Sequence, residues 1–240
     1  MAFDFDGKVV VVSGGTGALG TAVVERLLGA NAAVVIPVRE ERELERFPYR
    51  DHDHVTLEMN LDLTDADAVN TLYGSVRDLW ASIHIAGGFA MGSVDADDAP
   101  GQLEKMLALN ATTCFHCCSA AIRSLKAHDP RPRTRGRIVN VAARPGVYPR
   151  EGKGMAAYTA SKAAVVAMTE AIAAEVAEMG IWVNAIAPSI MDTPANRAAM
   201  PEANHDNWPK VEEVAETIVF LASPSNMVTT GGVVPVYGRS

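Results

Sequence analysis

Residues 13–20 read "SGGTGALG", and this glycine-rich stretch joins two segments of different periodicity. The preceding segment, "KVVVVSGG" (8–15), is a β-branched apolar run typical of a strand in a parallel sheet buried on both faces. The following segment, "ALGTAVVERLLGAN" (18–31), has apolar residues at helical spacing. Glycines at this junction permit a tight turn and let the backbone approach a pyrophosphate at the N-terminus of the helix. The stretch therefore predicts a strand–loop–helix unit that binds a dinucleotide.

The same alternation of strand and helix continues along the chain. Apolar runs predict strands over 8–15, 32–39, 55–63, 82–88, 136–143, 181–188 and 231–238. Helical spacing predicts helices over 18–31, 65–79, 100–128, 156–180 and 211–222. Such alternation favours an α/β fold, in which helices cover both faces of a doubly wound parallel sheet, the three-layer Rossmann fold. With no visible linker, we expect one NAD(P)-binding domain over residues 1–240, with a substrate loop near 189–210.

Composition narrows the classes of partner. The 240 residues are 48% hydrophobic and carry a formal net charge of −8, which argues against nucleic acid as the main partner. No run of about 18 uncharged apolar residues suggests a membrane span. The acidic start "MAFDFDGK" (1–8) does not resemble a signal peptide, so we expect a cytoplasmic protein with a small-molecule substrate.

The end of the second predicted strand bears on the choice of cofactor. An acidic residue there would bind the ribose 2′-hydroxyl of NAD, but this chain has Val38 and Arg39, with Arg42 close behind. A guanidinium group suits a 2′-phosphate. The sequence therefore favours NADP(H), and NAD(H) stays an alternative.

The segment "YTASK" (158–162) supplies a candidate acid–base pair. Tyr158 and Lys162 lie one helical turn apart and face the same way. A protonated lysine beside a phenol lowers the pKa of the phenol, because it favours the phenolate. Tyr158 could then exchange a proton near neutral pH, and Lys162 could also bind the ribose of a nicotinamide cofactor.

Taken together, these motifs resemble the short-chain dehydrogenase/reductase family over nearly the whole chain. Beside the glycine loop and the Tyr–Lys pair, Asp62 in "LDLTD", "IAGG" (85–88), Asn110 in "LALNAT" and "APSIMDT" (187–193) match its motifs. The resemblance implies Tyr158, Lys162 and Asn110 as catalytic residues, with Asn110 supporting a proton relay. It implies a cofactor site made of Ser13, Gly14, Gly15, Thr16, Gly17, Leu19, Gly20, Arg39, Asp62, Leu63, Ala86, Gly87, Gly88, Lys162, Pro188 and Thr193.

One residue of the family pattern is missing. A serine that hydrogen-bonds the substrate carbonyl is expected near Ala143, and losing such a donor costs a carbonyl reductase on the order of 3 kcal/mol. The stretches 85–92 and 191–209 resemble the quinonoid dihydropteridine reductases, a branch that also has alanine for this serine. That resemblance implies a conjugated heterocycle as substrate, contacted by Ala143, Phe89, Ser189 and Met191.

Other functions stay open. The substrate could be a quinone or an imine. The chain could also be a carbonyl or 3-oxoacyl reductase in which Ser189 replaces the missing donor, or a catalytically silent dinucleotide-binding sensor.

Two further expectations concern helices. Cys114, Cys117 and Cys118, with His116 between them, could suggest a metal site, but their spacing favours buried thiols in a core or a subunit interface, so no metal is predicted. The family resemblance implies a homodimer or homotetramer that pairs the helices at 100–128 and 156–180.

Overall fold

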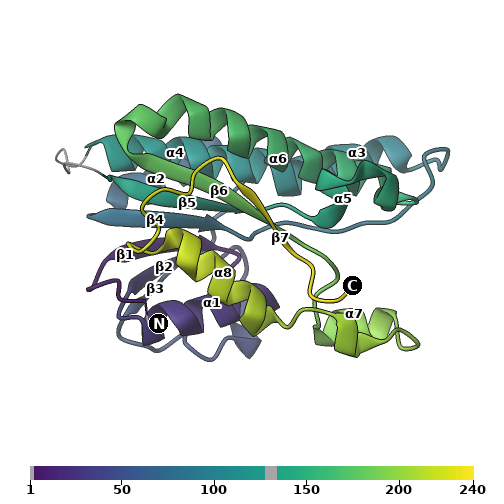
Figure 1. The fold of residues 1–240 in the computed structure, drawn as a ribbon, viewed down its shortest axis with the longest axis horizontal. Coiled ribbons are helices and arrows are strands. Elements are labelled where there is room, and N and C mark those ends of the chain that lie inside the picture. The colour runs from purple at the N-terminus through teal and green to yellow at the C-terminus, as the bar shows by residue number, and fades with distance from the viewer. Residues whose placement is uncertain (1–2, 128–133) are drawn as a thin grey trace.

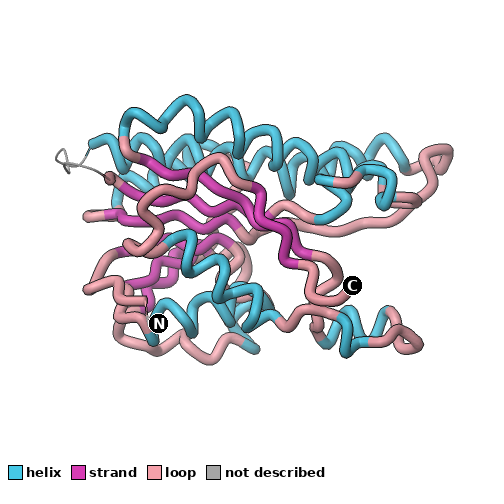
Figure 2. The backbone as a smooth tube through the Cα atoms, viewed as in Figure 1, coloured by secondary structure: helices cyan, strands magenta, loops and turns pink. Residues whose placement is uncertain are grey.

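The computed structural model describes residues 3–127 and 134–240, and in this part of the chain seven strands form one parallel sheet. The strand order is β3-β2-β1-β4-β5-β6-β7. The strands are β1 (Val9–Ser13), β2 (Ala33–Pro37), β3 (Val55–Glu58), β4 (Leu79–His84), β5 (Gly136–Val141), β6 (Ile181–Pro188) and β7 (Val233–Val236). The predicted doubly wound parallel sheet is confirmed (Figures 1 and 2).

Helices cover both faces of the sheet, as Figure 1 shows. One layer contains α1 (Ala18–Gly29) and α8 (Val211–Ala222), which contact each other. The other contains α2 (Ala66–Ser75), α4 (Thr113–Ala127) and α6 (Ala156–Val176). The remaining helices are α3 (Ala99–Met106), α5 (Arg144–Val147) and α7 (Pro194–Ala199). No helix in the described residues is both long enough and apolar enough to cross a membrane.

The core has two parts because successive strand residues point to opposite faces of the sheet. Val10 and Val12 of β1 pack in the cluster under α1 and α8, whereas Val11 packs in the cluster under α2, α4 and α6. Both faces are apolar, as the unbroken β-branched runs of the sequence predicted.

Some predicted boundaries are wrong where the backbone turns. Strand β3 ends at Glu58 and not at residue 63, because Asn60 has a left-handed φ of 57°. Helix α2 ends at Ser75, and the turn that follows has Asp78 at φ 54°. Leu79, predicted to end that helix, is the first residue of β4.

The long helix predicted over 100–128 is interrupted. A π-helical segment, η2 (Leu107–Thr112), joins α3 to α4, and residue 128 lies outside the described residues. Residues 189–210, the predicted substrate loop, contain α7 and a 3-10 turn, η5 (His205–Asn207). An ion pair between Arg197 and Asp192 (Nε–Oδ1, 2.5 Å) braces this segment.

The topology creates a crevice between β1 and β4. The chain runs outward from β1 to β3 and then returns to the other side of β1 as β4. At such a reversal the loops after the strands diverge, and ligands of open α/β sheets bind there. The loop "SGGTGALG" follows β1 at this point.

Candidate active site

A cavity of about 1050 Å³ lies at this reversal and gathers most of the predicted cofactor residues. Those that line it are Gly14, Thr16, Gly17, Leu19, Gly20, Arg39, Asp62, Leu63, Ala86, Gly87 and Thr193. Ser13, Gly15, Gly88, Lys162 and Pro188 are not in its lining. Residues separated widely in sequence therefore converge on one cavity.

The glycine loop is packed too tightly to accept side chains at key positions. A Cβ added to Gly20 would lie 2.0 Å from the carbonyl oxygen of Gly14. Gly14 itself has a φ of +70°, and a Cβ there would lie 2.7 Å from the backbone nitrogen of Ala86. The loop thus packs against the start of α1 and the segment after β4, and Gly14, Gly17 and Gly20 line the cavity.

The tip of β2 carries charges of both signs. The guanidinium of Arg39 lies 3.3 Å from the carboxylate of Asp62 (Nη2–Oδ2). Hydrogen bonds from the backbone and side chain of Thr64, and then the charge of Arg39, keep the pKa of Asp62 below its usual value. Arg42 and Arg46 also line the cavity, as do Glu43 and Glu45. Guanidinium groups and carboxylates therefore both line the region beyond the strand tip.

Glu43 is a site residue that the sequence prediction missed. Its carboxylate accepts hydrogen bonds from the hydroxyl of Thr16 (3.0 Å) and from the backbone N–H groups of Arg39 (3.1 Å) and Glu40 (3.0 Å). It therefore ties the glycine loop to the end of β2. Its position in the 3-10 turn η1 (Glu41–Arg46), which was predicted as no element, hid this role.

Tyr158 and Lys162 lie in the first turns of α6, but burial governs their protonation. The Nζ atom of Lys162 donates a hydrogen bond to the carbonyl of Val141 (2.7 Å), at the end of β5. Burial lowers the pKa of Lys162 to about 8 and raises the pKa of Tyr158 to about 12. The expected lowering of the tyrosine pKa by the lysine is not seen.

Asn110 sits in the π-helical segment and holds the loop after β4. Its amide oxygen accepts from the backbone N–H of Gly88 (2.9 Å), and its Nδ2 donates to the Gly88 carbonyl (3.0 Å) and to the hydroxyl of Ser161 (3.0 Å). A Cβ added to Gly87 would lie 2.4 Å from the Asn110 oxygen and 3.5 Å from the Lys162 nitrogen. Gly87 lines the cavity, so the side chains of Asn110 and Lys162 both lie close to the cavity lining.

On the substrate side, Phe89 lies beside Tyr158. Their ring centroids are 5.0 Å apart in an edge-to-face arrangement, and Phe89 is 60% exposed. Ala143 is buried after β5, where its methyl group offers no hydrogen bond. The hydroxyl of Ser189 donates to the carbonyl of Tyr237 (2.9 Å), while Met191 packs against the core. The hydroxyl proton of Ser189, suggested as a substitute donor, is thus engaged elsewhere.

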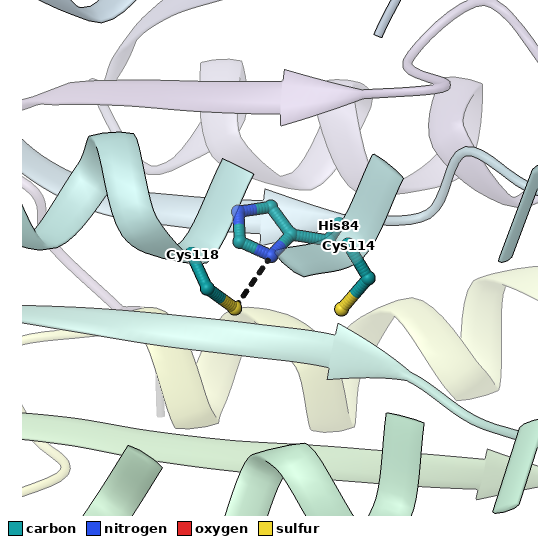
Figure 3. Close-up of side chains that lie close together, drawn as sticks. All are labelled: His84, Cys114 and Cys118. Carbon is teal, nitrogen blue, oxygen red and sulfur yellow. Dashed lines mark hydrogen bonds between the residues drawn. The ribbon is translucent and has the colours of Figure 1, made fainter. Parts of the chain in front are cut away.

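The three cysteines are buried in the core of this chain, as predicted. His116 does not join them, since its Nδ1 lies 3.2 Å from the carbonyl of Leu63. His84, at the end of β4, lies beside Cys114 and Cys118 instead (Figure 3). The strand pairing and the packing of α4 on the sheet bring it there, and neither was evident from the sequence.

Comparisons with known proteins agree with this geometry. The family model described as short chain dehydrogenase matches residues 8–204. A galactitol 2-dehydrogenase of Rhizobium johnstonii is 34% identical, covering 98% of this chain and 95% of that protein. LinX of Sphingobium indicum, a 2,5-dichloro-2,5-cyclohexadiene-1,4-diol dehydrogenase, is 29% identical over 99% of this chain and 98% of its own. The solved structure of ElxO with NADP bound superimposes with a TM-score of 0.82 at 25% identity, covering 96% of this chain and 97% of that one.

The chain therefore belongs to the short-chain dehydrogenase family. It is an oxidoreductase that depends on a nicotinamide dinucleotide.

Proposed function

We propose that this protein is an NADP(H)-dependent reductase of a conjugated ring, of which a quinonoid dihydropterin is the example. The observation that carries this proposal is the buried methyl group of Ala143, where a carbonyl-polarising hydroxyl is expected. When a conjugated ring accepts a hydride, the new charge spreads over several ring atoms. A single hydroxyl donor therefore matters less than it does for an isolated carbonyl, whose charge develops on one oxygen.

Gly14, Gly17 and Gly20 line the cavity and have no side chains, which suits the close approach of a dinucleotide's pyrophosphate. The guanidinium groups of Arg39, Arg42 and Arg46 at the cavity support a preference for a 2′-phosphate. The carboxylate of Glu43 is already engaged with Thr16 and two backbone N–H groups. The similar fold of ElxO, which was solved with NADP bound, is consistent with this preference.

Residues of the chain would position the substrate and cofactor and supply the proton. The bound nicotinamide would supply the hydride when reduced. Tyr158, whose pKa of about 12 keeps it protonated at neutral pH, would give the proton that completes the reduction. Lys162 would restore the tyrosine proton and bind ribose, and Asn110 would hold the loop at Gly88 in place. The exposed ring of Phe89 would stack against the substrate ring.

A second candidate is a dehydrogenase of hydroxyl substrates or a carbonyl reductase. The galactitol 2-dehydrogenase at 34% identity favours it, and so does LinX, whose name refers to a diol on a ring. A third candidate is a catalytically silent sensor that binds the dinucleotide. Such a protein would not need Tyr158 as a proton donor.

The test follows oxidation of NADPH and NADH by the purified protein. Freshly generated quinonoid dihydropterin is offered beside quinones, ketones, 3-oxoacyl thioesters and, in the reverse direction, polyols. We expect ring-dependent oxidation that Tyr158→Phe reduces at least a hundredfold, while the affinity for NADPH is retained. The proposal would be contradicted if Tyr158→Phe left the turnover of every substrate class unchanged. It would also be contradicted if the wild-type protein turned over none of these substrates.

Ala143→Ser separates the first two candidates. For a conjugated ring we expect no gain in kcat/KM, because the donor is not needed. A gain of about tenfold or more on ketones, without activity on rings, would identify a carbonyl reductase that lacks its donor.

A further inference from the structure

A second group of chemically reactive side chains lies beneath the active site and takes no part in the proposed reaction. It consists of His84 at the end of β4 and of Cys114 and Cys118, one turn apart on α4. All three are buried, and their donor atoms lie within 4.8 Å of one another. In Figure 3 the imidazole and both sulfur atoms point into the same space between sheet and helix.

The spacing of these atoms fits tetrahedral coordination. With metal–sulfur distances of about 2.3 Å and metal–nitrogen distances of about 2.0–2.1 Å, zinc places neighbouring sulfur and nitrogen ligands roughly 3.6 Å apart. The Sγ of Cys118 lies 3.5 Å from the Nδ1 of His84. The amide oxygen of Asn140 lies 2.8 Å from the same Nδ1 and 3.5 Å from the same sulfur, within reach as a fourth ligand.

The other ring nitrogen of His84 has the support that metal-binding histidines usually have. Its Nε2 lies 2.7 Å from the hydroxyl of Ser82, which is 2.6 Å from the hydroxyl of Tyr73. In this structure Nδ1 donates its proton to the Asn140 amide oxygen, so coordination through Nδ1 requires the proton to move to Nε2, where the Ser82 hydroxyl can accept a hydrogen bond from it.

From this arrangement we propose that His84, Cys114 and Cys118 bind one thiophilic divalent cation of the zinc type, with Asn140 as the fourth ligand. Two thiolates and an imidazole are a ligand set that zinc and cadmium prefer. Binding displaces the thiol protons of Cys114 and Cys118, which leave to solvent, while His84 keeps one ring proton on Nε2.

Cadmium is the probe, because its bonds to thiolates produce an ultraviolet charge-transfer band that depends on cysteine and not on catalysis. The full-length protein is titrated with Cd²⁺, each addition being followed until the absorbance is constant. Zinc content is measured in parallel on protein purified from zinc-supplemented cells and dialysed. We expect one equivalent of either metal.

Cys117 offers a matched control, since it is buried on the same helix but interacts with Tyr73. Cys117→Ala should keep the full band, whereas Cys114→Ala and Cys118→Ala should each weaken binding at least tenfold. Ser82→Ala, which leaves every ligand in place, should weaken it by on the order of 10- to 100-fold. Thermal unfolding and NADPH binding show which variants are folded.

Two results would overturn the proposal. One is the absence of stoichiometric metal in both experiments. The other is a band that survives in folded Cys118→Ala but is lost in Cys117→Ala.

Discussion

At the scale of single residues, burial affects the pKa values of Tyr158 and Lys162 more than the proximity of the two side chains does. Tyr158 and Lys162 are one turn apart, yet the Lys162 ammonium bonds to the carbonyl of Val141. Desolvation is the main influence on both groups: it raises the pKa of Tyr158 and lowers the pKa of Lys162. The protein keeps Tyr158 as an acid, which suits a proton donor.

The buried lysine predicts a pH-dependent stability. Its folded pKa of about 8 lies below the ordinary lysine value of 10.5, so the unfolded state binds more protons between these values. Wild-type stability should therefore rise with pH across this window, by at most about 3 kcal/mol. Lys162→Met should unfold at a higher temperature than wild type at pH 7, and its advantage should shrink toward pH 10.5.

Thermal unfolding at a series of pH values measures this difference. The exposed Lys126 of α4, replaced by Met, is the control and should give a constant offset. An advantage of Lys162→Met that grows between pH 8 and 10.5 would contradict the assignment.

At the scale of elements, the π-helical segment between α3 and α4 is the feature that positions Asn110. Its amide bonds both backbone groups of Gly88, next to Phe89, and so orders the loop that faces Tyr158. A π-segment inside a helix often marks a functional site.

Asn110→Ala should loosen this loop. Removing the amide leaves the backbone groups of Gly88 unpaired, at a cost of about 1–3 kcal/mol each where they stay buried. We expect a lower melting temperature and a kcat reduced at least tenfold. Asn70→Ala, an amide-to-alanine change on the exposed face of α2, is the control and should change neither quantity much. Unchanged stability and turnover in Asn110→Ala would refute the role of Asn110.

Sequence reasoning succeeded where local pattern sets structure. The strand at 181–188 and the helix at 211–222 have the predicted bounds, because β-branched runs and helical spacing are local signals. It could not find Glu43 or His84, whose partners Thr16 and Cys118 are distant in sequence. It also misjudged Tyr158, since desolvation depends on the packed sheet.

At the scale of the whole molecule, the outer surface of the α4–α6 layer has exposed apolar residues beside the charges of Arg123, Lys126, Glu170 and Glu175. Phe115 on α4 is 51% exposed, and the exposed positions of α6 include Ala160, Ala167, Ala171 and Ala174. Small residues allow close approach of another helix, which supports the expected pairing of two subunits through these helices.

Phe115→Glu should dissociate such an assembly. Size-exclusion chromatography with light scattering should give a dimer or tetramer for the wild type and a monomer for the variant. Val228→Glu, at a position 85% exposed after α8, is the control and should not change the mass. A monomeric wild-type protein would contradict the expected assembly.

The reversal of strand order between β1 and β4 also bears on folding kinetics. These adjacent strands are separated in sequence by α1, β2, β3 and α2, so their pairing closes a long loop and comes at an entropic cost. A dinucleotide in the crevice would touch the loops after both strands, and it could bind only once the two strands have paired. It should therefore slow unfolding while leaving the rate of refolding unchanged.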